Sequence, residues 1–151
     1  MKRFQIVQSA RDFYTSHSGL ALIGLALNRH TRLKKTLRSV PKRHGIPNVD
    51  LIRTFVGQLC LGKSDFEAVE NVRHDRYFKQ ALGIKQSPSA ARLRQRFDED
   101  ARALIPLIDD ASVDFVHHTQ APVTPLPMGH VALDMDVFPM DNSGTKKEGV
   151  S

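Results

Sequence analysis

A chain of 151 residues has room for one ordinary domain, or for one small domain and part of a second. No apolar run reaches the roughly 18 residues that cross a membrane, and the apolar segment 19–27 lacks the surroundings of a signal peptide, so we expect a cytoplasmic protein. The single cysteine, Cys60, excludes an internal disulfide and a cysteine-based zinc cluster, and its apolar neighbours predict a buried structural thiol.

Positive charge is concentrated in the first part of the chain. The formal net charge is +6, but residues 1–63 contain twelve Lys and Arg against only Asp12 and Asp50, a balance of +10. Residues 64–151 carry a balance of −4. Such asymmetry is typical of chains that bind polyanions, nucleic acids in particular. A solvated basic surface without a partner is the alternative.

Two helices are predicted before residue 41. The apolar segment 19–27 has the length of a buried helix. Thr31 can cap a helix over 32–40, in which Leu33 and Leu37 share one face. The remainder of that helix and the loop after it carry cations that we predict to contact DNA, namely Lys34, Lys35, Arg38, Lys42 and Arg43.

Helix-capping residues divide the middle of the chain. Asn48 is a suitable N-cap for a helix over 49–61. Ser64 and Glu67 have the spacing of a capping box, which predicts that a helix over 65–72 follows. Two helices joined by so short a link are typical of a helical hairpin or a helix-turn-helix.

Three more helices are expected before residue 119. Asp75 can cap a helix that ends at Gly83, and Ser87-Pro88 predicts the start of the next. A last helix is predicted over 98–118, kinked or split by Pro106. The helix that begins at Ser87-Pro88 carries side chains suited to base edges and phosphates, and we predict DNA contacts from Arg92, Arg94, Gln95 and Arg96.

The last stretch has a different pattern. After a proline-rich connector, residues 119–129, an apolar run carries Asp134 and Asp136. In a strand these two carboxylates would share one face, where a divalent cation could compensate them; surface alternation is the plain alternative. Residues 141–144 are rich in turn formers, and 145–151 would return as a second strand, which together predict a β-hairpin.

The predicted fold class is therefore mainly α. We expect a basic, helical, DNA-binding domain over residues 1–118, the connector over 119–129, and a hairpin over 130–151 that would begin a further domain. A two-stranded hairpin is not stable alone, so the chain is expected to stop just after that domain has begun.

Three stretches carry a resemblance to a known family. They are Leu61-Gly62-x-x-Asp65 with the segment 73–83, Ser87-Pro-Ser89 running into 93–99, and Leu133-Asp-Met-Asp136 with Lys147-Glu148-Gly149. In this order they resemble the N-terminal portion of a bacterial insertion-sequence transposase of the DDE class.

The resemblance implies a helical front domain followed by the start of an RNase H-like α/β catalytic domain. The implied partner is double-stranded DNA at insertion-sequence ends, with a homodimer as one option and a nucleoid-associated location. Asp136 would be the first catalytic acid, with Asp134 as its reserve because Val137-Phe138-Pro139 stands where the family has a threonine or serine. In the complete enzyme these acids would bind Mg²⁺ or Mn²⁺ for phosphoryl transfer.

The later acids of the family would lie beyond Ser151, so this chain alone is expected to be inactive. Two other hypotheses remain open. A stand-alone, repressor-like helical DNA-binding module would account for the basic half but not for the hairpin. A haloacid-dehalogenase-like phosphatase fragment would account for Asp134-x-Asp136, but that fold needs a long chain after the motif.

Overall fold

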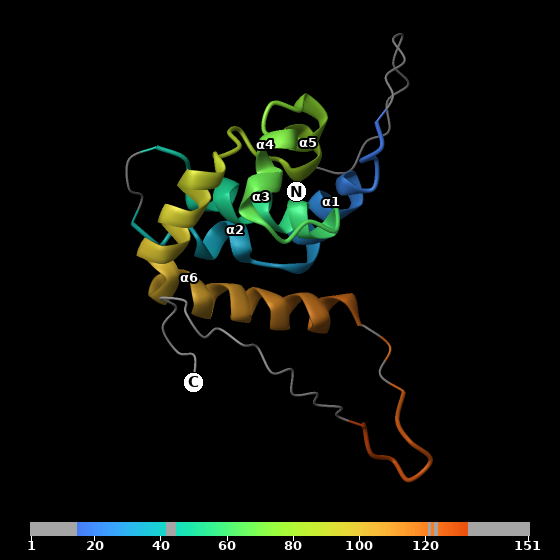
Figure 1. Ribbon diagram of the computed structural model, residues 1–151. Helices are drawn as coiled ribbons and strands as arrows, with labels where there is room; N and C mark the ends of the chain where they lie inside the picture. The colour runs from blue at the N-terminus through green and yellow to red at the C-terminus, as the bar shows by residue number, and fades with distance from the viewer. Residues whose placement is uncertain (1–14, 42–44, 121, 123, 133–151) are drawn as a thin grey trace, which may run out of the picture. The chain divides into compact units, whose positions relative to one another are not determined.

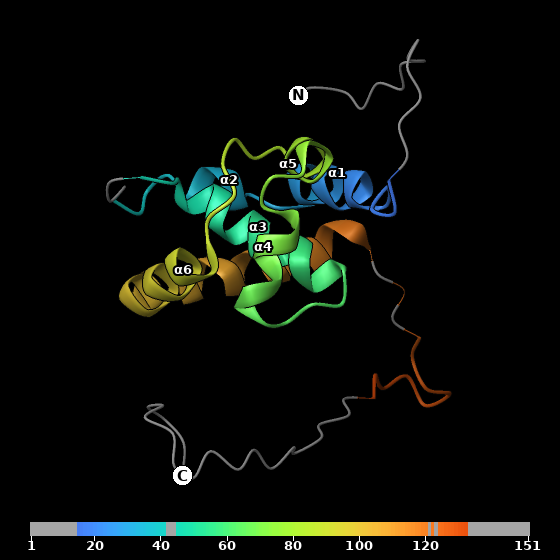
Figure 2. The same cartoon turned by 45° about the horizontal axis from the view of Figure 1, so that its top comes forward.

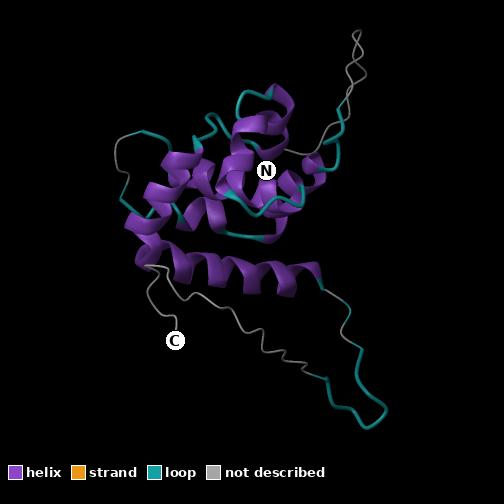
Figure 3. Cartoon of the chain, viewed as in Figure 1, coloured by secondary structure: helices purple, strands orange, loops and turns teal. Residues whose placement is uncertain are grey.

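The computed structural model describes residues 15–41, 45–120, 122 and 124–132. These residues are mainly helical and contain no strand (Figure 3), which confirms the predicted class. The predicted hairpin falls almost entirely outside the described residues.

The elements are α1 (Leu20–His30), α2 (Leu33–Thr36), α3 (Asn48–Cys60), the 3₁₀ helix η1 (Phe66–Ala68), α4 (Val69–Val72), α5 (Arg76–Leu82) and α6 (Ala90–Thr119). The chain divides into two units, 1–121 and 122–151, and all seven elements lie in the first.

Helix α3 lies in the middle of the other helices (Figures 1 and 2). Its residue Ile52 packs with Leu33 of α2 and Leu104 of α6 in one apolar cluster. Its residue Leu51 packs with Val69 and with residues at the start of α6 in a second cluster. A third cluster joins α1 to α5 through residues that include Leu20, Phe78 and Leu82. The core is thus divided into three parts arranged around α3.

Local capping signals determine where α5 begins and ends, as the sequence predicts. The Asp75 carboxylate accepts hydrogen bonds from the backbone N–H groups of Tyr77 and Phe78. Gly83 ends the helix in the left-handed conformation, with φ of 64°. Tyr77 also donates a hydrogen bond to the Ser18 carbonyl, which ties α5 to the turn before α1.

Other predicted caps are displaced. Asn48 is the first residue of α3 and makes no capping bond to it. Asp65, rather than Ser64, caps the helix that follows, by accepting from the Ala68 N–H. For α6 the cap is Ser89, which accepts from the Arg92 N–H, rather than Ser87. Helix α2 is also shorter than predicted.

Helix α6 is continuous where the sequence predicts two helices. It runs from Ala90 to Thr119 with Pro106 inside it. Figures 1 and 2 show that α6 changes direction between its N-terminal part, drawn in yellow, and its orange C-terminal part, as expected for a proline that removes one helical hydrogen bond. Burial of Leu104 and Ala111, on either side of the proline, holds both segments against the core.

Helices α1 and α5 approach each other closely at Gly24. An added Cβ at Gly24 would overlap the carbonyl oxygen of Ala81 and lie 3.3 Å from the Leu82 Cα. Because these are backbone atoms, the contact could be relieved only by separating the two helices. The close approach therefore requires glycine at this position.

We predict that Gly24→Ala destabilises the protein by about 3 kcal/mol, since one methyl group forces two packed backbones apart. Gly19→Ala is the matched control, because its Cβ would meet no atom within 4 Å and its φ of −59° suits alanine. Urea unfolding followed by circular dichroism measures both. Equal midpoints for the two variants would contradict the close packing of α1 on α5.

Candidate nucleic-acid interface

A basic surface is formed by α1, α2 and the residues that flank them. Residues 15–41 contain no Asp or Glu. Their five Lys and Arg side chains are all exposed; they are Arg29, Arg32, Lys34, Lys35 and Arg38. Leu33 and Leu37 of the same segment are each only 3% exposed, because they pack into the core with α3 and α6. Burial of these two leucines turns the neighbouring cations towards solvent.

Four of these cations surround one hollow, here called the basic hollow. Its volume is about 480 Å³, and its lining contains Leu27, Asn28, Thr31, Arg32, Lys34, Lys35 and Arg38. The lining has no carboxylate and no aromatic ring. A hollow with four positive side chains and no negative one is chemically suited to anionic groups.

The four cations differ in their partners. In the described part of the chain, no carboxylate lies within ion-pair distance of Lys34, Lys35 or Arg38. Arg32, in contrast, donates from Nε and Nη2 to the two carboxylate oxygens of Asp114, at 2.9 and 3.0 Å. These hydrogen bonds raise the pKa of Arg32 and lower that of Asp114. Three cations of the hollow are therefore left for an external anion.

The residues predicted on α6 lie apart from the basic hollow and interact locally. Arg92 donates to the Gln95 side chain at 3.0 Å, and Gln95 donates to Glu99 at 2.9 Å. Arg94 binds Glu67, and its guanidinium lies 5.5 Å from the centre of the Phe66 ring. The hydrogen bond from Arg94 is the main cause of the lowered pKa of Glu67. These side chains are exposed, but they have partners on their own surface.

Arg96 is buried, with a relative exposure of 2%. Its guanidinium donates from Nε to Asp100 at 2.9 Å and also binds the Asn48 side chain, which joins α6 to the start of α3. On α6, the predicted DNA contacts are therefore restricted to Arg92, Arg94 and Gln95. The Arg96–Asp100 spacing of four residues was the available sequence signal for this pair.

Arg53 is a second buried cation that the charge count includes. It is 1% exposed, and it donates to the Leu82 carbonyl at 2.9 Å and to the Asn28 side chain at 2.6 Å. Burial lowers its pKa. On the same helix, Asp50 accepts hydrogen bonds from the backbone N–H groups of Lys85 and Gln86, each at 3.0 Å. Arg53 therefore fixes the core and adds no charge to the surface.

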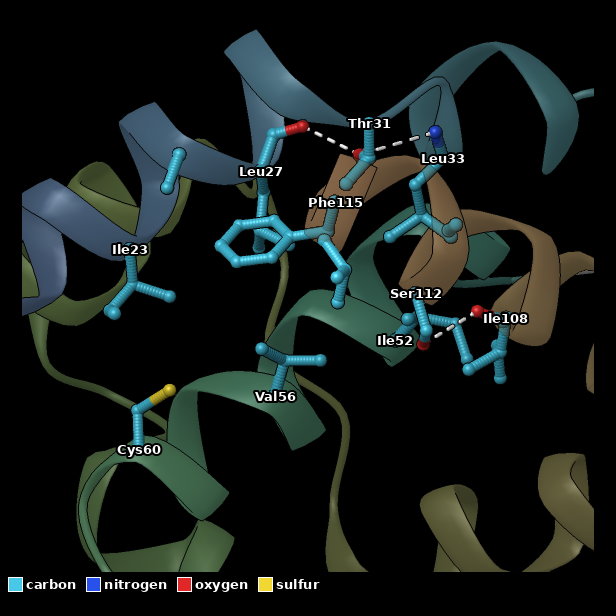
Figure 4. Close-up of a pocket in the computed structure, with 13 residues that line it drawn as sticks. Ile23, Leu27, Thr31, Leu33, Ile52, Val56, Cys60, Ile108, Ser112 and Phe115 are labelled. Atoms are coloured by element: carbon cyan, nitrogen blue, oxygen red, sulfur yellow. Dashed lines mark hydrogen bonds between the residues drawn. The ribbon is translucent and has the colours of Figure 1, made fainter. Parts of the chain in front are cut away.

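A second hollow, shown in Figure 4, is apolar. It has a volume of about 360 Å³ and lies among residues of α1, α3 and α6. The hydroxyls of Thr31 and Ser112 in its wall donate to the carbonyls of Leu27 and Ile108, so they are already satisfied. Cys60 also lines this hollow and is exposed, so the prediction of a buried thiol is wrong. Partial desolvation raises the pKa of the Cys60 thiol, which disfavours the nucleophilic thiolate form.

Four predicted site residues lie outside the described residues, namely Lys42, Arg43, Asp134 and Asp136. Their proposed contacts with DNA or with a metal ion stay predictions. Within the described ranges, no group of three or more His, Cys, Asp or Glu is placed to hold a metal ion. None of the described helices is long and apolar enough to cross a membrane.

The two arginines of α6 provide a test of these assignments. We predict that Arg96→Gln destabilises the protein by about 3 kcal/mol or more, because it removes the buried guanidinium that binds both Asp100 and Asn48. Arg94→Gln should leave the unfolding midpoint nearly unchanged, because Arg94 and Glu67 face solvent. Urea unfolding of both variants is the measurement. An unchanged midpoint for Arg96→Gln would return Arg96 to the candidate DNA-contacting residues.

Of the hollows on the described surface, the basic one contains three of the predicted DNA-contacting side chains, Lys34, Lys35 and Arg38. No family model, curated protein or solved structure matches the chain.

Proposed function

We propose that the unit of residues 1–121 binds double-stranded DNA through its phosphates, at the basic hollow. The observation that carries this proposal is the set of three exposed cations, Lys34, Lys35 and Arg38, without a described carboxylate partner. Each cation that neutralises a phosphate releases counterions from the duplex, and this release supplies binding free energy without any new apolar contact.

The chemistry of the lining favours duplex over single-stranded nucleic acid. Sites for single strands add aromatic side chains on which bases stack, and the basic hollow has none. Its lysines interact with phosphates as point charges rather than reading base edges. We therefore propose binding that depends little on base sequence at this surface. Arg92, Arg94 and Gln95 on α6 form a second candidate surface, where base reading would require them to leave their present partners.

We expect the wild-type chain to bind a 20-base-pair duplex with an affinity that falls steeply with salt. The variant Lys34→Gln/Lys35→Gln/Arg38→Gln should give a plot of log K against log [salt] that is shallower by roughly 3, about 0.9 for each lost phosphate contact. Fluorescence anisotropy at several salt concentrations measures this slope.

The control for this experiment removes the same charge elsewhere. Lys63→Gln/Arg76→Gln/Lys85→Gln neutralises three exposed cations outside α1 and α2, and it should retain most of the wild-type slope. If both triple variants lose the same slope, binding depends on overall charge, and the basic hollow is not the site. If the wild-type chain fails to bind at any salt concentration, the proposed function is wrong.

The resemblance to DDE transposases extends this proposal. We propose that the helical unit holds DNA for a catalytic domain in which Asp136, with Asp134 in reserve, belongs to the metal-binding acids. Two metal ions held by carboxylates from separate elements would activate the attacking oxygen and stabilise the leaving one. Asp134 and Asp136 alone are too few to hold two ions, so this chain would bind DNA without cutting it.

We expect no nicking or strand transfer by this chain with Mg²⁺ or Mn²⁺, and metal-dependent activity when the chain is extended through the downstream reading frame. Asp136→Ala in the extended chain should abolish that activity, whereas Asp134→Ala should retain it. A gel assay on element-end DNA measures both. A downstream frame that encodes no later aspartate and glutamate would instead favour the stand-alone DNA-binding module.

A further inference from the structure

Arg32 differs from the other cations of the basic hollow because it is held by an acidic residue of α6. The planar guanidinium presents Nε and Nη2 to both carboxylate oxygens of Asp114. The two residues are 82 positions apart in the sequence. A phosphate offers the same pair of oxygens to a guanidinium as a carboxylate does, so the two anions can use one edge of Arg32 in turn.

The C-terminal ends of α1 and α6 are tied together beside this pair. The ring Nδ1 of His30 is 3.1 Å from the His118 carbonyl, and the ring Nδ1 of His118 is 3.1 Å from the His30 carbonyl. The His30 ring also packs edge-on against Phe115, at 6.1 Å between ring centres. Only Thr31 separates His30 from Arg32, and Phe115 follows Asp114 directly, so these contacts fix the two segments that carry the ion pair.

The exposure of the two side chains shows that Arg32 is accessible to an external anion. The Arg32 side chain is 69% exposed, whereas that of Asp114 is 16% exposed. The carboxylate is thus confined by its surroundings, and the guanidinium lies at the surface on a long, flexible side chain. An ion pair with one partner at the surface contributes little to the stability of the fold, so replacing Asp114 should release Arg32 without unfolding the chain.

Building on the proposed DNA-binding function, we propose that Asp114 competes with DNA phosphate for Arg32 and so limits the affinity of the basic hollow. In the free protein Asp114 withholds the fourth cation of the hollow. The chain then binds DNA through three cations at this site, and loss of the Asp114 carboxylate makes the fourth available. Asp114 is in this sense a residue that sets affinity without touching DNA.

The test is a double-mutant cycle on Arg32 and Asp114, with duplex binding measured by anisotropy. Asp114→Asn should steepen the salt slope by about 0.9, as one added phosphate contact requires. It should also tighten binding about tenfold at low salt, as one added charge-assisted hydrogen bond implies. Arg32→Gln should change wild-type affinity little, but it should remove the whole gain in the Asp114→Asn background. Asp114→Ala repeats the test without a side-chain amide that could still bind Arg32.

Asp109→Asn is the matched control, because it makes the same charge change at an exposed position of the same helix. Asp109 has no ion-pair partner among the described residues, so its variant reports only the general effect of one lost negative charge. If Asp114→Asn gains no more affinity than Asp109→Asn, the proposed competition is wrong. It is also wrong if Arg32→Gln weakens wild-type binding as strongly as it weakens Asp114→Asn.

Elution from heparin–agarose separates this inference from the proposed function. If the wild-type chain binds no duplex, DNA binding is overturned, but heparin still tests whether Asp114 withholds Arg32 from a polyanion. Later elution of Asp114→Asn than of Asp109→Asn, cancelled by Arg32→Gln, would support the competition. Equal elution of the two aspartate variants would overturn it.

Discussion

The structure depends on helix α3, which is buried although it carries charged side chains. Burying a charge is costly unless other groups compensate it, and here the compensation comes from the surrounding segments. Arg53 donates to the Leu82 carbonyl and to Asn28, whereas Asp50 accepts from the backbone after α5. These hydrogen bonds fix α1, α5 and the α5–α6 connection around one helix. Short helices such as α4 and α5 are marginal alone in water, so the packing of α4 on α3, and of α5 on α1 and α3, makes them stable.

The geometry of the basic hollow follows from this arrangement. Helix α2 has only four residues, and its position is determined by the burial of Leu33 and Leu37 against α3 and α6. The intervening Lys34 and Lys35 have no alternative but to face solvent. The basic surface is therefore a consequence of the packing of α2 against the core. The apolar hollow shares Leu27 and Thr31 with the basic one, but the two hydroxyls in its wall already donate to backbone carbonyls.

Formal charge overstates the positive charge that is free for a ligand. Arg53 and Arg96 are buried in the core, and Arg32 and Arg94 are engaged by Asp114 and Glu67. An electrostatic argument from composition treats all of these cations as equivalent. Their partners distinguish cations buried in the core, cations paired with a carboxylate at the surface, and exposed cations without such a partner. Only the last group can bind DNA phosphates and release counterions without first giving up a partner.

The sequence by itself determined the features that depend on a few neighbouring residues. Its periodicity predicted a mainly helical chain and the inward face of Leu33 and Leu37, and its capping residues predicted the start and end of α5 at Asp75 and Gly83. Capping and amphipathic spacing act within one or two turns, so they can be read without knowledge of the fold.

Only the tertiary structure decided which cationic side chains, and which side chains expected to cap helices, bind residues that are distant in the sequence. Arg96 meets Asn48 across 48 residues, and Arg32 meets Asp114 across 82. The same contact withdraws Asn48 from its predicted capping role, and burial on both sides of Pro106 keeps α6 continuous. Local sequence cannot show these outcomes, because a side chain's burial and charge compensation depend on which distant segments fold against it.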